Sequence, residues 1–257
     1  MIKIDCHLHS WKSKDSSIIP SRYFGKILRA KGLQGIALTD HNSVDAWQHF
    51  RALCKDLGLI FIPGAEIQTR DPKRGELLCF FLQEAVKSRN FWEVCDEVRD
   101  QGGFVYLAHP FDLIRQNWIK NRKSILVNPK ARASLDGVEG INARNLVRSS
   151  NTNAITWGRH FGLGMSGGSD AHSILEIGEA FSIFDGISAE SLLDDPEDLE
   201  ELRKMFRSHE VTCGRFSTNP IYIHLFNVVK KYTSGLTQVT DLVKRPLMWS
   251  QMLGSLK

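Results

Sequence analysis

The first ten residues, MIKIDCHLHS (residues 1–10), join an apolar, strand-like run to two histidines, His7 and His9. Residues 2–6 are typical of a buried strand. If the strand continues, its alternation places His7 and His9 on one face, about 6.5–7 Å apart along the backbone. Two imidazoles at that spacing can converge on one metal ion. The same pattern, an apolar strand that ends in polar residues, recurs along the chain and indicates the fold.

Short apolar segments alternate with amphipathic segments over most of the length. The expected strands are residues 2–6, 35–39, 59–63, 76–82, 104–108, 137–141, 164–166 and 180–184. The expected helices are residues 21–30, a segment after Asn42 or Ser43 that ends at Gly58, residues 91–99 and residues 153–160. A strand followed by a helix, repeated six or seven times, predicts parallel strands with helices outside. Because polar residues recur at the strand ends, a closed barrel is favoured over an open sheet.

The character of the sequence changes after residue 186. Asp195 can cap a helix with Pro196 in its first turn, and further helices are expected after Pro220. The apolar stripe of the first of these helices is Leu199, Leu202, Met205 and Phe206. We therefore expect a single domain over residues 1–257, with a barrel in residues 1–186 and a helical extension packed on it in residues 187–257.

Composition bounds the class of protein. The 257 residues, 42% hydrophobic and 24% charged, are typical of a globular domain with a buried core. No apolar run is long enough for a membrane span, and the start reads as a strand rather than a signal peptide, so a cytoplasmic protein is expected. The five cysteines form no CxxC pair, which favours free thiols. Residues 207–257 carry seven Lys/Arg against two Asp/Glu, either a solvated face or a surface for a polyanion.

Polar residues gather where the expected strands end. They occur as Thr39-Asp40-His41, as Glu66, as His109 before a proline, and as Asp170 with His172. With His7 and His9, this set holds five of the nine histidines. Burying them together without a cation would be costly. A mixed set of imidazoles and carboxylates suits zinc, manganese or iron, so the pattern predicts a metal centre.

The ordered motifs HxHS, TDH, GAE, AHP and GSDAH resemble the polymerase and histidinol phosphatase (PHP) superfamily of metal-dependent phosphoesterases. The segment Ser13-Lys14-Asp15-Ser16 resembles a serine–aspartate step of the same family. The resemblance covers residues 1–184 and adds nothing for the rest. It implies a distorted (β/α)7 barrel that holds two or three divalent metal ions.

The resemblance also implies three groups of ligands. His7, His9, Glu66 and Asp170 would hold a first metal; Glu66 would bridge to a second, which His109 also binds; Asp15, His41 and His172 would hold a third.

One departure from the family pattern concerns the second metal. Family members often supply a further His or Cys to this metal from the region that is residues 138–145 here, and this chain has neither. Asn142 or Glu139 could substitute, or water could complete a weak site. Asp40 would orient His41 or a metal-bound water.

The implied activity is hydrolysis of phosphate esters by a metal-activated water. Asp40, His41 or His172 could assist proton transfer, and Arg144 is the candidate for binding the phosphate. Lys14 and Arg70 are weaker candidates.

The expected substrate is a nucleotide or an oligonucleotide end. The alternatives are a histidinol-phosphate-type small-molecule phosphatase and a non-catalytic metal-binding module of a larger assembly. Amide hydrolysis is less favoured because no strand end offers a lysine. The oligomeric state cannot be read from the sequence. His49, His160, His209 and His224 are interpreted as structural.

Overall fold

The structure is a computed structural model that describes residues 1–70, 75–112, 125–187, 199–209 and 211–215. Met1–Thr218 form one compact unit, and a second unit, Asn219–Lys257, lies outside the described residues. The helix start expected at Asp195 and Pro196 and the helices expected after Pro220 also lie outside them.

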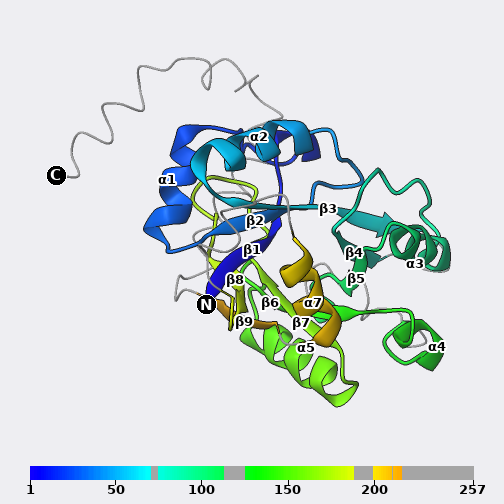
Figure 1. The fold of residues 1–257 in the computed structure, drawn as a ribbon. Helices are drawn as coiled ribbons and strands as arrows, with labels where there is room; N and C mark the ends of the chain where they lie inside the picture. Colours follow the sequence, from blue (N-terminus) through cyan, green and yellow to red (C-terminus); the bar gives the residue numbers. More distant parts are fainter. Residues whose placement is uncertain (71–74, 113–124, 188–198, 210, 216–257) are drawn as a thin grey trace, which may run out of the picture. The chain divides into compact units, whose positions relative to one another are not determined.

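Nine strands form one sheet in sequence order, and an additional pairing of the first strand with the eighth closes it into a barrel (Figure 1). The barrel strands are β1 (Ile2–Leu8), β2 (Gly35–Leu38), β3 (Ile60–Thr69), β4 (Gly75–Phe80), β5 (Phe104–Leu107), β6 (Gly137–Asn142), β7 (Gly164–Gly168) and β8 (Ala180–Phe184). The expected barrel is therefore confirmed.

The strands are not all parallel, which corrects the simple repeat of strand and helix. β1, β2 and β3 run parallel, as do β5, β6 and β7, but β4 and β8 are antiparallel to both neighbours. Thr69 of β3 pairs with Gly75 of β4, so only a short segment joins these strands. A parallel crossover needs a dozen or more residues, and the connection is too short for one.

Helices cover the outside of the barrel, with α1 (Arg22–Ala30) and α2 (Trp47–Leu57) on one side and α5 (Arg148–His160) on another (Figure 1). Helix α3 (Phe91–Asp100) follows β4, and the short α4 (Pro129–Arg132) precedes β6. Helix α5 begins earlier than the expected residue 153.

Helix α2 begins at Trp47, several residues after the expected caps Asn42 and Ser43. Asn42 is used elsewhere, because its backbone N–H donates to the Glu66 carbonyl and its side-chain oxygen accepts from Gln68 N. These bonds hold the chain after β2 against β3, so His41 lies close to Glu66.

The amino-terminal end of the barrel is closed by apolar side chains. Helix α7 (Glu200–Ser208) buries Leu202, Met205 and Phe206, as the sequence predicted. The Phe206 ring contacts the rings of Phe80, Phe81, Phe104, Tyr106 and Phe184, with centroids 5.2–5.7 Å apart.

The part of the extension that the structure describes is not all helical, because β9 (Thr212–Arg215) pairs antiparallel with β8. All five cysteines are free thiols. No helix within the described residues is long and apolar enough to cross a membrane.

Candidate metal centre

The predicted ligands meet at the other end of the barrel, where the parallel strands finish. His7 lies one residue before the end of β1 and His9 follows the strand, while His41 follows β2 and His109 follows β5. Asp170 and His172 follow β7. Glu66 lies in the middle of the long strand β3, which extends past the ends of its neighbours. Most of these side chains are buried, while Asp15 lies at the rim with 55% of its side chain exposed.

Glu66 is the centre of the cluster, since its two carboxylate oxygens face four imidazoles. Its Oε1 lies 3.1 Å from His109 Nε2 and 3.5 Å from His7 Nε2. Its Oε2 lies 2.8 Å from His41 Nδ1 and 3.4 Å from His9 Nε2. A carboxylate in this position can bridge two cations, as the resemblance implies for Glu66.

The orientations of His7 and His9 are fixed from behind. His7 Nδ1 lies 2.8 Å from Glu139 Oε1, which accepts its hydrogen bond. His9 Nδ1 lies 3.2 Å from Ser13 Oγ. The Ser13 hydroxyl donates its own hydrogen to Asp40 at 2.6 Å, so it accepts from His9. Both rings therefore direct their Nε2 atoms into the cluster, as metal-binding histidines do.

The chain's own geometry fits a metal cation. His7 Nε2 and His9 Nε2 lie only 3.0 Å apart. With both Nδ1 atoms acting as donors, two bare Nε2 lone pairs would repel each other at this distance. The contact requires a positive charge, supplied either by a proton on His7 or by a metal ion bound to both rings. The surrounding donors, imidazole nitrogens and carboxylate oxygens, suit zinc, manganese or iron.

The pKa values of the metal-free cluster follow the same logic. Burial disfavours protonated His7, but the carboxylates of Glu139, Asp170 and Glu66 outweigh it and raise its pKa well above the usual value. Burial, with the nearby rings of His172 and His41, lowers the pKa of His9 well below its usual value. The His7 imidazolium can thus donate to neutral His9, with a proton in the place that a metal ion would take.

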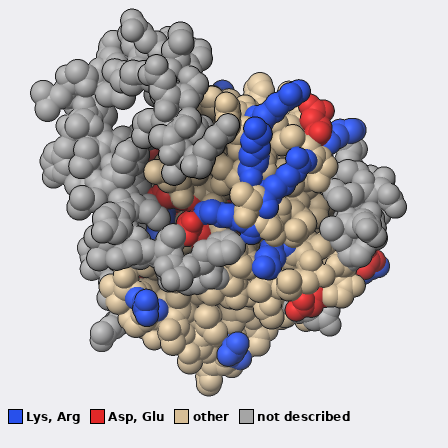
Figure 2. Space-filling model, turned by 90° about the vertical axis from the view of Figure 1, so that its left-hand side faces the viewer, with Lys and Arg blue, Asp and Glu red and all other residues tan. Residues whose placement is uncertain are grey.

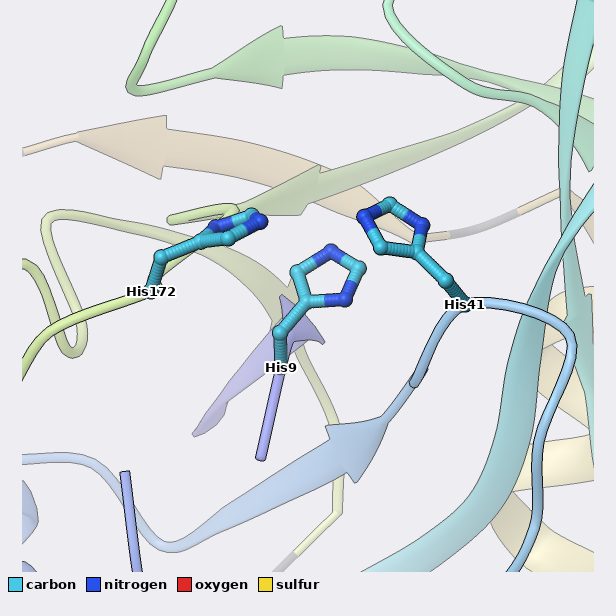
Figure 3. Close-up of side chains that lie close together, drawn as sticks. All are labelled: His9, His41 and His172. Carbon is cyan, nitrogen blue, oxygen red and sulfur yellow. The ribbon is translucent and has the colours of Figure 1, made fainter. Parts of the chain in front are cut away.

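Three further histidine and carboxylate groups converge at the rim. Asp15 Oδ2 lies 3.2 Å from His172 Nε2 and 3.4 Å from His41 Nε2. The rings of His9, His41 and His172 come from three separate segments and turn toward one another (Figure 3). Their ligand atoms lie within 4.8 Å of one another. His9 therefore neighbours both the first and the third predicted ligand groups.

The backbone that carries Asp170 is tightly constrained. Asp170 adopts a positive φ of 55°, and its N–H donates to the His7 carbonyl. Gly168 has no room for a side chain, because an added Cβ would lie 2.2 Å from His7 Cβ. Positive φ values at non-glycine residues are strained and tend to occur at functional sites. Asp170 Oδ1 consequently lies 3.3 Å from His9 Nε2.

Three residues that were expected to orient or complete the metal ligands make different contacts in the structure. Asp40 accepts hydrogen bonds from Ser10 and Ser13, and so it supports His9 through Ser13 rather than the ring of His41. Glu139 lies behind His7, and its other oxygen accepts from His109 N at 2.7 Å. Asn142 donates to Glu139 and Asp170.

Of the proposed phosphate ligands, Arg144 reaches the cluster, with Nη1 2.7 Å from His172 Nδ1. Lys14 is exposed beside Asp15, whereas Arg70 lies four residues beyond Glu66, about 13 Å along the strand.

One carboxylate of the cluster was not predicted from the sequence. Glu76 Oε2 lies 3.4 Å from His109 Nε2. Ligand atoms of Glu76, His41 and Glu66 also lie within 4.8 Å of one another. Glu76 was not predicted because it lies at the beginning of its strand, whereas ligands were expected at strand ends. β4 runs antiparallel, so its first residues lie at the same end of the barrel as the last residues of β3 and β5.

Known proteins resemble this chain in sequence. The model of the PHP domain matches residues 5–137, and a model described as PHP-associated matches residues 148–199. The uncharacterized protein MJ0417 of Methanocaldococcus jannaschii is 31% identical over 199 residues, which cover 77% of this chain and 75% of that protein. A second protein of that organism, MJ1587, is 30% identical over 152 residues, or 55% of this chain and 82% of its own length.

A solved structure shares the fold. It is a two-domain protein from Bacteroides vulgatus described as containing a predicted PHP-like metal-dependent phosphoesterase. It superimposes with a TM-score of 0.65 at 20% identity, covering 83% of this chain and 64% of its own. The barrel, the sequence match over half of the chain and the clustered motifs agree: this chain belongs to the PHP domain family.

Proposed function

We propose that this protein is a metal-dependent phosphoesterase that hydrolyses the phosphate ester of a nucleotide or of an oligonucleotide end. The observation that carries the proposal is the buried carboxylate of Glu66 in contact with four imidazoles. The proposal is also supported by membership of the PHP family and by the description of the Bacteroides protein that shares its fold.

His7, His9, Asp15, His41, Glu66, His109, Asp170 and His172 are the residues that would hold two or three divalent ions. When bound, such ions lower the pKa of water and neutralise the oxygens of a phosphoryl group. The chain supplies their orientation: Glu139 and the Ser13–Asp40 pair fix the rings of His7 and His9. Asp40 is fully engaged by its donors, so its role here is positioning, while Asp15, His41 and His172 lie nearest the rim.

Arg144 is suited to bind the substrate phosphate. His172 Nδ1 lies 2.8 Å from the carbonyl oxygen of Asp170, to which it donates when Nε2 faces a metal. The same nitrogen cannot then accept from Arg144, although Nη1 lies 2.7 Å away. Arg144 Nε is buried, lies 3.5 Å from Glu176 Oε1 and has no hydrogen-bond partner among the described residues. The guanidinium therefore has donors available for the paired oxygens of a phosphate.

Exposed basic side chains beside Asp15 and along the outside of α1 favour an anion with more than one phosphate. Lys12 and Lys14 are exposed next to Asp15, and α1 exposes Arg22, Lys26 and Arg29. Their spacing of four and three residues puts these α1 side chains on one face of the helix. Figure 2 shows Lys and Arg side chains gathered beside acidic side chains near the centre of this face. This charge supports oligonucleotide ends and nucleotides with several phosphates over esters with a single phosphate.

We also propose that residues 1–257 act as one domain, with residues 187–257 as an extension of the barrel, and that the protein works in the cytoplasm. The described part of the extension, α7 and β9, packs on the barrel and supports the first point. The free thiols are consistent with a reducing compartment.

The proposal is tested by elemental analysis of the purified protein together with phosphate release from a panel of nucleotides with added Mn²⁺. We expect two or three metal ions per chain, and loss of phosphate release in His9→Ala and Asp170→Asn. His160→Ala removes an exposed histidine on α5 and should behave as wild type. Full activity in Asp170→Asn, or none in the metal-loaded wild type, would contradict the proposal.

Salt dependence separates the two substrate classes. Activity on oligonucleotides should fall steeply between about 50 and 200 mM salt, because binding of a polyanion releases counterions. Activity on a mononucleotide should fall much less. Replacing Arg22 and Lys26 together by glutamine should flatten the salt dependence for oligonucleotides only. An oligonucleotide activity that ignores salt would exclude a role for this surface.

A further inference from the structure

The carboxylate of Glu76 lies in the cluster at a position suited to a metal ligand. It lies at the start of β4, with only 9% of its surface exposed. Its Oε2 faces His109 Nε2 at 3.4 Å, and that same nitrogen lies 3.1 Å from Glu66 Oε1. One imidazole nitrogen and two carboxylate oxygens thus point into one small region. An imidazole nitrogen directed at two carboxylates needs a positive charge between them, which a proton or a metal ion can supply.

Glu139 and Asn142, the other residues that could complete the second metal site, bind elsewhere. Glu139 accepts from His7 Nδ1 and from His109 N. Asn142 donates to Glu139 and to Asp170, which turns its amide nitrogen, and not an electron pair, toward the cluster. Within the described part of the chain, Glu76 is the carboxylate that faces the Glu66–His109 pair from β4, the strand between β3 and β5.

We propose that Glu76 is a direct ligand of the second metal, together with Glu66 and His109, and that its carboxylate raises the ratio of Mn²⁺ to Zn²⁺ affinity at this site above that of a site with an imidazole in its place. The inference rests on the proposed metal-dependent function. Two carboxylates and one imidazole form an oxygen-rich set, whereas His7, His9, Glu66 and Asp170 offer two imidazoles. Carboxylate oxygens suit manganese and magnesium, while imidazole suits zinc. The second site should therefore discriminate less strongly against Mn²⁺ than the first site does.

The register of β3 and β4 brings Glu76 close to Glu66. Gln68 pairs with Glu76 across β3 and β4, and Glu66 pairs with Leu78. Glu66 and Glu76 are therefore diagonal neighbours on adjacent strands, within reach of a long side chain. Ala108 N donates to the Glu76 carbonyl, which fixes the start of β4 against the residue before His109. The three ligands are held by three adjacent strands.

The test measures metal binding without substrate, by elemental analysis and calorimetric titration of the full chain with Mn²⁺ and with Zn²⁺. Glu76→Gln should lose one equivalent of Mn²⁺, or bind it about ten- to a hundredfold more weakly. Glu76→His should regain the equivalent, with its preference shifted about tenfold or more toward Zn²⁺. Glu179→Gln is the matched control, because Glu179 is a buried carboxylate whose side chain pairs with Lys31 and not with a predicted metal ligand.

The outcomes are decisive in both directions. Wild-type metal number and Mn²⁺ affinity in Glu76→Gln would overturn the proposal, as would an equal loss in Glu179→Gln. If Glu76→Gln does not fold, an unchanged ratio of Mn²⁺ to Zn²⁺ affinity in Glu76→His would overturn it. Because no substrate is used, a failure of the phosphoesterase proposal would appear separately, as metal-loaded protein that releases no phosphate.

Discussion

The two ends of the barrel are built from opposite materials. At the amino-terminal end, Phe206 of α7 closes the interior among five other aromatic rings. At the carboxyl-terminal end, Glu66 and Asp170 are buried among imidazoles. Aromatic packing stabilises the fold without any ligand. Buried ionisable groups do so only when they are paired with one another, with protons or with metal ions.

The difference indicates how one barrel divides its tasks. The aromatic end can supply stability because nothing there has to bind or react. The polar end holds strained backbone at Asp170 and His109, together with charges that need a partner. Sites of function commonly carry such local costs, which the rest of the fold offsets. The two ends should therefore respond differently to mutation: changes at the aromatic end should alter stability, and changes at the polar end should alter metal binding.

The largest effect is expected at the aromatic end. Phe206→Ala should lower the free energy of unfolding by about 3–5 kcal/mol, because it leaves a cavity among well-packed rings. The number of bound metal ions in the folded protein should not change. Denaturant unfolding and elemental analysis measure the two quantities. Tyr23→Ala, which truncates an aromatic ring that is 60% exposed, should shift stability by no more than about 0.5 kcal/mol. Loss of metal in Phe206→Ala would show that the two ends are not independent.

Much of the fold could be predicted because apolar runs and strand ends are local signals. The expected strands at residues 2–6, 35–39 and 180–184 correspond closely to β1, β2 and β8. The direction of β4 and the pairing of β9 depend on which segments meet in space, and no local pattern encodes that. Ligands were expected only at the last residues of each strand, which is correct only if all strands are parallel. Glu76 was therefore not predicted.

At the polar end, Glu139→Gln should weaken metal binding about ten- to a hundredfold, because Glu139 orients His7 and raises its basicity. The stability of the metal-free protein should change far less than in Phe206→Ala. Titration with Mn²⁺ and unfolding in the presence of a chelator give the two values. Glu97→Gln is the control, because Glu97 lies on α3 and accepts hydrogen bonds from the backbone N–H groups of Lys87 and Ser88. Equal Mn²⁺ affinity in both variants would show that Glu139 does not support a ligand.

The candidate site was predictable where the ligand itself is a rare residue type. His7, His9, His41, His109 and His172 stand out because histidines are few and end apolar runs. Supporting residues carry no such mark. Ser13 is one serine among many, and its importance follows only from its position between His9 and Asp40.

A smaller effect is expected from Ser13→Ala. The change removes the acceptor of His9 Nδ1 and the donor to Asp40, so His9 can take up either tautomer. Metal affinity should fall about tenfold, at the lower end of the effect of such supporting groups. Titration with Mn²⁺ measures the loss, and Ser13→Thr, which keeps the hydroxyl, should restore most of it. If Thr and Ala behave alike, the hydroxyl does not fix His9.

The finest distinction between the two ends is their response to pH. In the metal-free protein, burial opposes protonation of His41, but Glu66 and Asp15 raise its pKa to about 11, and carboxylates likewise raise that of His7. Both rings therefore carry an extra proton at neutral pH. A metal ion binds only bare nitrogens, so binding at pH 7 should release about two protons per chain, and affinity should fall as the pH is lowered. Titration calorimetry in buffers of different ionisation enthalpy counts these protons. His160→Ala should leave the count unchanged and His41→Ala should reduce it by about one. A binding enthalpy independent of the buffer would mean that the imidazoles of the polar end are already deprotonated before the metal arrives.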